Sequence, residues 1–251
     1  MKMLAIQRLN MDNSWMIHWN DTKIVLDPWL VGTEVDGFRW FNEQWHATKP
    51  MSIEELSSFD AVIVSQPYSD HCHTETLKKI QHATPIFAAK NTATRIKKEW
   101  DEAMPTVLED NTWMPFNEFK IMMMKSENWI NSFYDAIVIA HEDEAIFYAA
   151  HGFKPSLAQL NLLAKFNIRL LITTFTYFKL PFFLGGTVNP GYEAALRLAN
   201  QLQAKKIMNT HDEQKPGKGL VLRIAKTKYQ ETKSIEDPRF VLMGNYQLQT
   251  L

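Results

Sequence analysis

The sequence predicts an α/β protein with two mixed β-sheets packed face to face and helices outside, a four-layer αβ/βα sandwich. Two observations predict it. The chain twice passes from a run of strands into alternating strands and helices, and no Gly/Ser-rich linker separates the two halves. Of its 251 residues, 45% are hydrophobic and 22% are charged, as in a globular protein with a large core. We therefore expect residues 1–251 to form a single domain.

The first half begins as an antiparallel meander and continues with β/α units. Alternating or continuous apolar residues predict strands over residues 4–9, 14–19, 22–26, 59–65 and 85–88, and helices over 75–81 and 91–100. Residues 27–49, which contain Pro28, Gly32 and Gly37, are predicted to form a loop.

The second half repeats the same order. The pattern predicts strands over residues 119–125, 136–140, 145–149, 169–173 and 206–210, and helices over 155–166, 191–203 and 219–228. Because functional loops in such proteins follow the carboxyl ends of strands, we expect the chemistry to lie there.

Composition excludes several classes of function. The formal net charge is -1, which gives no electrostatic footprint for nucleic acid. No apolar run approaches the ~20 residues that span a bilayer, and no signal-peptide pattern is present, so we expect no membrane partner. A lone cysteine, Cys72, excludes an internal disulfide and fits a reducing compartment. We expect a cytoplasmic protein.

Polar side chains follow three predicted strands. Residues 70–73, Asp-His-Cys-His, come after the strand at 59–65, and His151 and His211 each follow a later strand. Imidazole and carboxylate ligands suit zinc, iron or manganese. The alternative is a polar loop that caps the next helix, with histidines that are only structural.

The first of these clusters resembles the metallo-β-lactamase superfamily, in which a strand is followed by the pattern H-x-H-x-D-H. Asp70 and His71 match the last two positions of that pattern. Gln66 and Tyr68 stand where its first two histidines are expected. The resemblance therefore implies the family fold, with a metal site that has lost part of its usual ligands.

The resemblance continues along most of the chain. His151 stands at the position of the aspartate that bridges two metals, and His211 matches the final histidine. Residues 26–32, Leu-Asp-Pro-Trp-Leu-Val-Gly, are similar to a segment of the lactonase-like and sialic-acid-hydroxylase-like branches.

The resemblance implies one divalent metal ion, with zinc favoured and iron or manganese as alternatives. The second metal position keeps its ligands Asp70, His71 and His211, and His151 adds a neutral one, whereas Gln66 is a poor zinc ligand. His73 would be a spare ligand or a partner of a ligand. The residues expected to orient the ligands are Asp27, Gln66 and Asp212.

These expectations favour a hydrolase acting on an ester, lactone or amide of a small-molecule substrate. A metal-bound water would attack, Asp70 would be a ligand or proton acceptor, and Tyr68 would donate a hydrogen bond to the developing oxyanion. One alternative is a catalytically inactive binding protein that keeps the fold. Another is a redox or oxygenase role with iron.

Two aromatic loops, residues 29–45 and 175–186, complete the set of candidate functional segments. The first would line an apolar or sugar-binding pocket at the mouth of the site. The alternatives are a loop packed by its own aromatic residues or a homodimer contact. Residues 175–186 would reach the same pocket.

Overall fold

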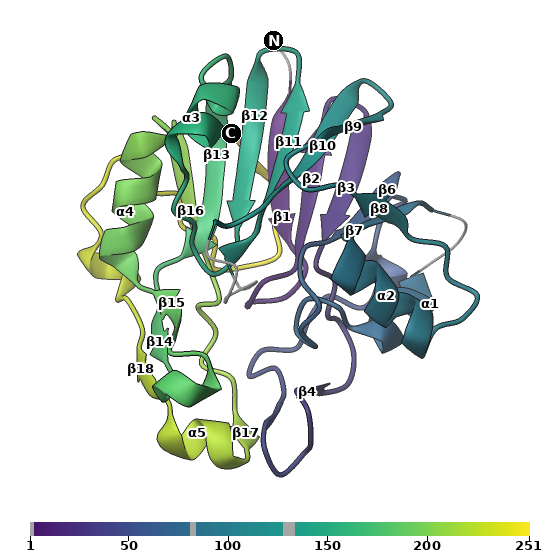
Figure 1. The fold of residues 1–251 in the computed structure, drawn as a ribbon, viewed down its shortest axis with the longest axis vertical. Coiled ribbons are helices and arrows are strands. Elements are labelled where there is room, and N and C mark those ends of the chain that lie inside the picture. The colour runs from purple at the N-terminus through teal and green to yellow at the C-terminus, as the bar shows by residue number, and fades with distance from the viewer. Residues whose placement is uncertain (1–2, 81–83, 128–133) are drawn as a thin grey trace. The chain divides into compact units, whose positions relative to one another are not determined.

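The structure, a computed structural model, describes residues 3–80, 84–127 and 134–251 (Figure 1). The chain divides into two compact units. Unit 1 comprises Met1–Leu108, Glu213–Arg223 and Met243–Leu251, and unit 2 comprises Glu109–Asp212 and Ile224–Leu242. Each unit is built on one mixed sheet, so the predicted α/β class with two mixed sheets is confirmed. That the whole chain is a single domain stays a prediction.

The main sheet of unit 1 consists of β1 (Leu4–Arg8), β2 (Trp15–Trp19), β3 (Thr22–Leu26), β6 (Ala61–Val64), β7 (Ile86–Ala89), β8 (Thr106–Leu108) and β19 (Gln249–Thr250). Their order in the sheet is β19-β1-β2-β3-β6-β7-β8. The meander β1–β3 is antiparallel, whereas β3, β6, β7 and β8 run parallel. Every residue of β6 is buried, which explains its continuous apolar sequence.

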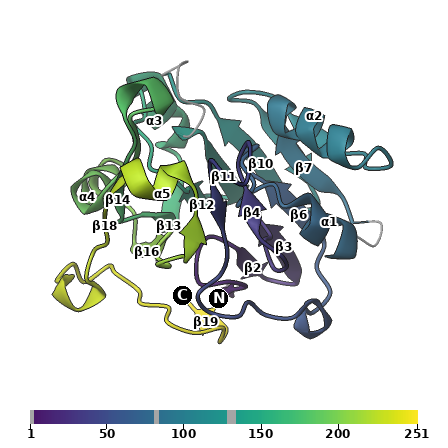
Figure 2. The same ribbon diagram turned by 90° about the horizontal axis from the view of Figure 1, so that it is seen from below.

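Two helices, α1 (Thr74–Ile80) and α2 (Lys90–Glu99), lie beside β6 and β7 (Figure 2). Both are amphipathic: Leu77 and Ile80 of α1, and Ala93 and Ile96 of α2, enter one hydrophobic cluster with Val62 and other strand residues. The carboxyl end of the parallel strand β6 is thereby held against a packed core. Gln81, the expected last residue of the first helix, lies outside the described residues.

The predicted loop 27–49 contains two short strands. β4 (Glu34–Val35) and β5 (Glu43–Gln44) form a small sheet with β17 (Gly217–Lys218) from the later part of unit 1. Just after β17, Gly219 has a φ of +118°, and a Cβ atom there would lie 2.6 Å from the carbonyl oxygen of Phe41. The close approach of the two segments therefore requires glycine at this position.

The aromatic residues of this loop fall into two groups. Trp29 is buried, and its ring centroid lies 3.8 Å from that of His46. Phe38 and Trp40 are 66% and 67% exposed, and their rings stack at 6.0 Å. Trp29 therefore packs in the interior of unit 1, whereas a pocket wall and a homodimer contact stay predictions for the exposed pair.

The main sheet of unit 2 consists of β9 (Trp113–Phe116), β10 (Phe119–Met124), β11 (Ala136–His141), β12 (Glu144–Ala149), β13 (Asn167–Thr174) and β16 (Lys206–Thr210). Their order is β16-β13-β12-β11-β10-β9. Strands β9 to β12 are antiparallel, and β12, β13 and β16 are parallel. The carboxyl ends of β12 and β16 therefore face the same edge of the sheet, with β13 between them.

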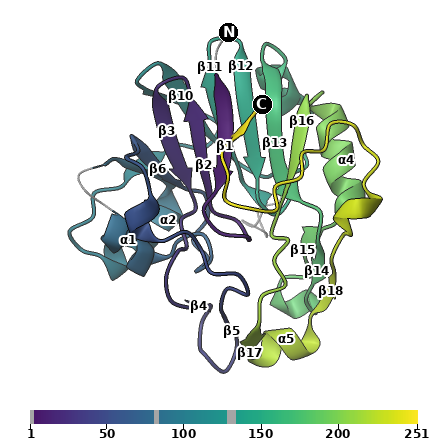
Figure 3. The same ribbon diagram turned by 180° about the vertical axis from the view of Figure 1, so that it is seen from behind.

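Two helices of unit 2 cover the apolar residues of this sheet. α3 (Leu157–Leu163) begins at Ser156, whose side chain accepts a hydrogen bond from the backbone N–H of Gln159, as a capping box does. α4 (Tyr192–Gln201) lies beside β13 and β16 (Figure 3). Leu163 and Leu198 share one hydrophobic cluster with Phe147, Leu171 and other sheet residues.

The predicted helix over residues 219–228 is wrong in its second half. α5 covers only Leu220–Ile224, and Lys226–Lys228 forms strand β18. In unit 2, β18 pairs with β14 (Tyr177–Lys179), which also pairs with β15 (Thr187–Pro190). The antiparallel partner overrides the weak local preference of these lysines for helix. Within the described residues, the structure contains no helix that is both long and apolar enough to cross a membrane.

Candidate metal centre

Asp27 lies at the carboxyl end of β3 and organises the polar interior of unit 1. Its fully buried carboxylate accepts hydrogen bonds from the Ser65 backbone N–H at 2.6 Å, the Ser65 hydroxyl at 2.5 Å and Nδ1 of His71 at 2.7 Å. Asp27 has a φ of 44°, a left-handed conformation that is uncommon outside glycine. The backbone is thus held in an unusual form that aims this carboxylate at His71.

His71 is completely buried in the turn that follows β6. Its backbone N–H donates to the carbonyl oxygen of Tyr68, and its Nε2 lies 3.7 Å from Oδ1 of Asp70. Burial alone would lower the pKa of His71, but the charges of Asp70 and Asp27 outweigh it and raise the pKa to about 9. Because Nδ1 is bound to Asp27, a metal ion would have to bind His71 through Nε2.

Asp70 belongs to a second polar group in unit 1. The ammonium of Lys215 lies 2.8 Å from Oδ2 of Asp12, 3.1 Å from Oε1 of Glu34 and 3.8 Å from Oδ2 of Asp70. Carboxylate oxygens of Asp12 and Asp70 lie within 4.8 Å of each other. The Asn13 side chain donates to the carbonyl oxygen of Asp70 at 2.8 Å, which anchors the backbone of this turn.

Burial has opposite consequences for the charges in this group. It raises the pKa of Glu34 well above its ordinary value, although Lys215 counteracts it. Burial would lower the pKa of Lys215, but Asp12, Glu34 and Asp70 together raise it well above its ordinary value. Lys215 is therefore an ammonium, and the acidic side chains around it are what keep it charged.

The other candidates near His71 are placed differently. Gln66 is buried and Tyr68 is half-buried, and the Tyr68 carbonyl oxygen accepts hydrogen bonds from the backbone N–H groups of His71 and Cys72. His73 is buried, with Nδ1 2.9 Å from the Thr76 hydroxyl and Nε2 3.4 Å from the carbonyl oxygen of Thr33. Burial lowers the pKa of His73. Both ring nitrogens of His73 thus have protein partners within unit 1.

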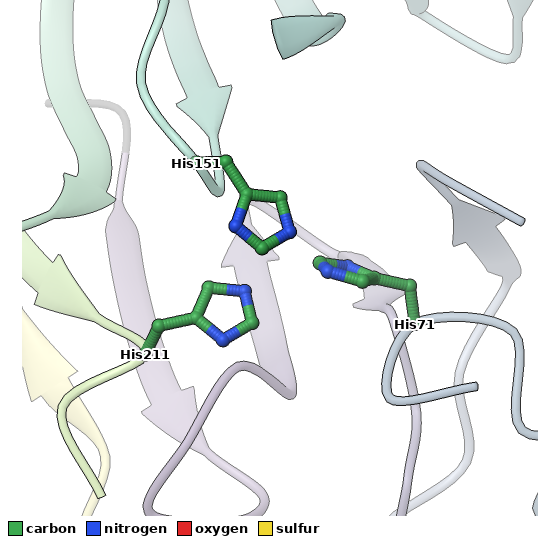
Figure 4. A group of neighbouring side chains, drawn as sticks. All are labelled: His71, His151 and His211. Carbon is green, nitrogen blue, oxygen red and sulfur yellow. The ribbon is translucent and has the colours of Figure 1, made fainter. Parts of the chain in front are cut away.

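Unit 2 contributes two histidines that lie together. His151 and His211 follow β12 and β16, their rings stack at 4.5 Å with an interplanar angle of 15°, and their ligand nitrogens lie within 4.8 Å of each other. Nδ1 of His151 donates to Oδ1 of Asn189 at 2.6 Å, and the carbonyl oxygen of His211 accepts from the Thr176 hydroxyl at 2.8 Å. Figure 4 draws both side chains, and His71 of unit 1, on their loops.

His211 has the same unusual backbone conformation as Asp27. Its φ is 53°, again in the left-handed region, at a point where a strand has just ended. Such backbone conformations cost about 1–3 kcal/mol each and persist only where the surrounding structure holds them. Asp212, the next residue, is half-buried.

Sequence reasoning missed several polar residues of these groups. Asp12, Glu34 and Lys215 stand far apart in the sequence, and no motif links them. Asn189 lies in β15, a strand that the apolar pattern did not predict. His46 follows no predicted strand and gave no sequence signal either, and its Nδ1 lies 3.1 Å from the buried carboxylate of Glu213.

Comparisons with known proteins agree on the fold. The family model described as "Beta-lactamase superfamily domain" matches residues 10–211. Igni18, a metallo hydrolase from the hyperthermophilic archaeon Ignicoccus hospitalis, is 10% identical with a TM-score of 0.69, over 99% of this chain and 98% of that chain. An isothiocyanate hydrolase from Delia radicum gut bacteria is 18% identical with a TM-score of 0.69, over 99% and 98% of the two chains.

A third similar structure has a different activity in its name. CmlA, a diiron beta-hydroxylase from Streptomyces venezuelae, is 10% identical with a TM-score of 0.67, over 99% of this chain and 54% of that chain. No curated protein matches the sequence. The structural matches confirm the metallo-β-lactamase-like fold. Because the family model covers most of the chain, this protein belongs to the beta-lactamase superfamily domain family.

Proposed function

We propose that the protein is a metal-dependent hydrolase in which Asp70, His71, His151 and His211 hold one divalent metal ion. The observation that carries it is the way the histidines are oriented. Asp27 binds Nδ1 of His71, and the Asn189 amide oxygen binds Nδ1 of His151.

This donor set fits a metal ion. A ligating histidine usually donates its other ring N–H to a carboxylate or carbonyl-type oxygen, which fixes the tautomer and turns the free nitrogen toward the metal. His71 and His151 both have this arrangement, in which Nε2 would be the nitrogen that binds the metal. Three imidazoles and one carboxylate suit zinc best, with iron or manganese as alternatives.

A metal ion bound there would lower the pKa of a coordinated water toward about 7 and so supply hydroxide at neutral pH. Asp27 holds His71 in one orientation, and Asn189 does the same for His151. Asp70 lies beside Nε2 of His71, and its carboxylate would serve as a ligand or accept a proton. Tyr68 is expected to donate a hydrogen bond to the developing oxyanion.

The expected substrates are esters, lactones or amides of small molecules. Two similar structures are hydrolases by name, one of them an isothiocyanate hydrolase, which supports hydrolysis as the reaction class. The cytoplasmic location and the absence of nucleic-acid and membrane partners remain predictions from composition.

Metal analysis tests the proposal. We would purify the full chain without chelator and measure bound metals by mass spectrometry, beside an Asp70→Ala/His211→Ala double variant. The matched control is a His18→Gln/His141→Gln variant, which changes one histidine in each unit on strands β2 and β11, away from the proposed ligands. About one equivalent of zinc in the wild type and control, lost in the double variant, is the expected result.

Other outcomes would redirect the assignment. About one equivalent of iron would favour the redox reading, and oxidation assays would then replace the esterase and lactonase screen. No bound metal after reconstitution would refute the hydrolase proposal and leave a binding protein built on the family fold.

A further inference from the structure

Lys215 lies in an environment that is unusual for a lysine. Its ammonium lies within 3.8 Å of three carboxylates, those of Asp12, Glu34 and Asp70, and only 12% of its side chain is exposed. Lysines are almost never buried unless they are paired, and here one base faces three acids. The cluster formed by these four residues therefore has more acidic groups than its single ammonium can balance.

The surrounding structure holds the lysine in place. Its ammonium lies 5.1 Å from the centroid of the buried Trp29 ring, a cation–π distance. The segment 213–216, which contains Lys215, is hydrogen-bonded to the loop before β6 on both sides of the lysine. Glu213 accepts a hydrogen bond from the Thr48 backbone N–H at 2.7 Å, and the Pro216 carbonyl oxygen accepts one from the Trp45 N–H at 3.0 Å.

We propose that the ammonium of Lys215 is the resident cation of the carboxylate cluster Asp12, Glu34 and Asp70, in the place where these oxygens would otherwise bind a metal ion. All four residues belong to unit 1, so the proposal does not depend on unit 2. It rests on the proposed function only where it assigns Lys215 a second role, that of a positioning residue for the ligand Asp70.

The chemistry of the cluster supports this inference. Carboxylate oxygens are the preferred ligands of hard divalent cations such as Mg²⁺, Ca²⁺ and Mn²⁺. A fixed ammonium provides charge compensation without exchange, which prevents a second ion from binding beside Asp70. Replacing Lys215 by methionine, of similar length but without charge, would leave three buried acids with no cation.

The test measures metal stoichiometry. The full chain, purified without chelator, is dialysed against excess Mn²⁺ and then against buffer, and bound metals are counted by mass spectrometry. The variants are Lys215→Met, Lys215→Arg as the control that keeps the charge, and Lys215→Met/Asp12→Asn. We expect Lys215→Met to bind one more equivalent of Mn²⁺ than the wild type, whereas Lys215→Arg and the double variant gain none.

Each result bears on one proposal at a time. Equal Mn²⁺ content in wild type and Lys215→Met would overturn the role of Lys215, while zinc in both would still support the hydrolase. A gain of Mn²⁺ in Lys215→Met, beside a wild type that binds no metal at all, would support the role of Lys215 and count against the hydrolase.

A merely structural lysine would not change metal content, and the electron paramagnetic resonance spectrum of bound Mn²⁺ provides the second readout. If Lys215→Met does not fold alone, excess Mn²⁺ must restore its cooperative unfolding transition, and failure to do so would overturn the inference.

Discussion

The pair formed by Asp27 and His71 predicts a specific pH dependence of stability in the metal-free protein. The folded structure raises the pKa of His71 from 6.5 to about 9, chiefly because Asp70 and Asp27 outweigh the effect of burial. The stabilisation is fully present below pH 6.5, where His71 is protonated in both states. It is lost as the pH rises through about 9.

The magnitude follows from the size of the shift. Each pKa unit corresponds to about 1.36 kcal/mol, so the shift of His71 from 6.5 to about 9 contributes on the order of 3 kcal/mol to the free energy of unfolding. We expect this free energy to fall between pH 6.5 and 9 by an amount of that order. His71→Gln should remove the fall, and Asp27→Asn should reduce it while leaving the contribution of Asp70.

Urea denaturation at a series of pH values, in the presence of a chelator, measures this free energy. Tryptophan fluorescence is a suitable probe because six of the eight tryptophans, at positions 15, 19, 29, 40, 45 and 100, belong to unit 1, which contains His71. His18→Gln is the control: burial lowers the pKa of His18 below 6.5, so this variant should keep the wild-type slope between pH 6.5 and 9. An unchanged pH slope in His71→Gln would refute the reasoning.

Three further predictions concern separate parts of the structure. Asn189→Ala removes the acceptor that orients His151, and metal affinity, measured by competition with a chromophoric chelator, should fall about 10–100-fold, whereas an unchanged affinity would count against that orienting role. Cys72 is fully buried and burial raises the pKa of its thiol to about 12, so Ellman's reagent should react with it only after unfolding, and rapid reaction of the native protein would contradict this. Gly219→Ala would bring a Cβ atom against the Phe41 carbonyl, so the loop 36–45 should become more sensitive to limited proteolysis, and unchanged protection would show that the contact is dispensable.

The main sheets could be predicted because their strands contain a local pattern. The strand β6 is apolar throughout, and its assignment needed no knowledge of its neighbours. The short strands could not be found in this way: β17 has two residues, and β18 is Lys-Thr-Lys, which is paired only because Tyr177–Lys179 lies beside it. Elements that exist through a distant partner have no periodicity of their own.

The same distinction, between residues with a local sequence signal and residues that depend on a distant partner, applies to the candidate site. Strand-end position and residue type were enough to select His71, His151 and His211 from the sequence. The partners that orient them depend on contacts across long sequence separations, such as the 44 residues between Asp27 and His71. Lys215 is the extreme case, because its closest carboxylate, that of Asp12, lies 203 residues earlier in the chain.

The chain passes from unit 1 to unit 2 and back again, and this order has a consequence for synthesis on the ribosome. Unit 1 is made of three separate stretches, and the last of them, Met243–Leu251, contains β19, which pairs with β1. A nascent chain that has just completed Leu108 still lacks Lys215 and the edge strand β19. Asp12 and Glu34 therefore remain without their cation until the chain has been made through Lys215. Residues 1–108 thus expose these acidic groups and an open sheet edge until these later segments have been made.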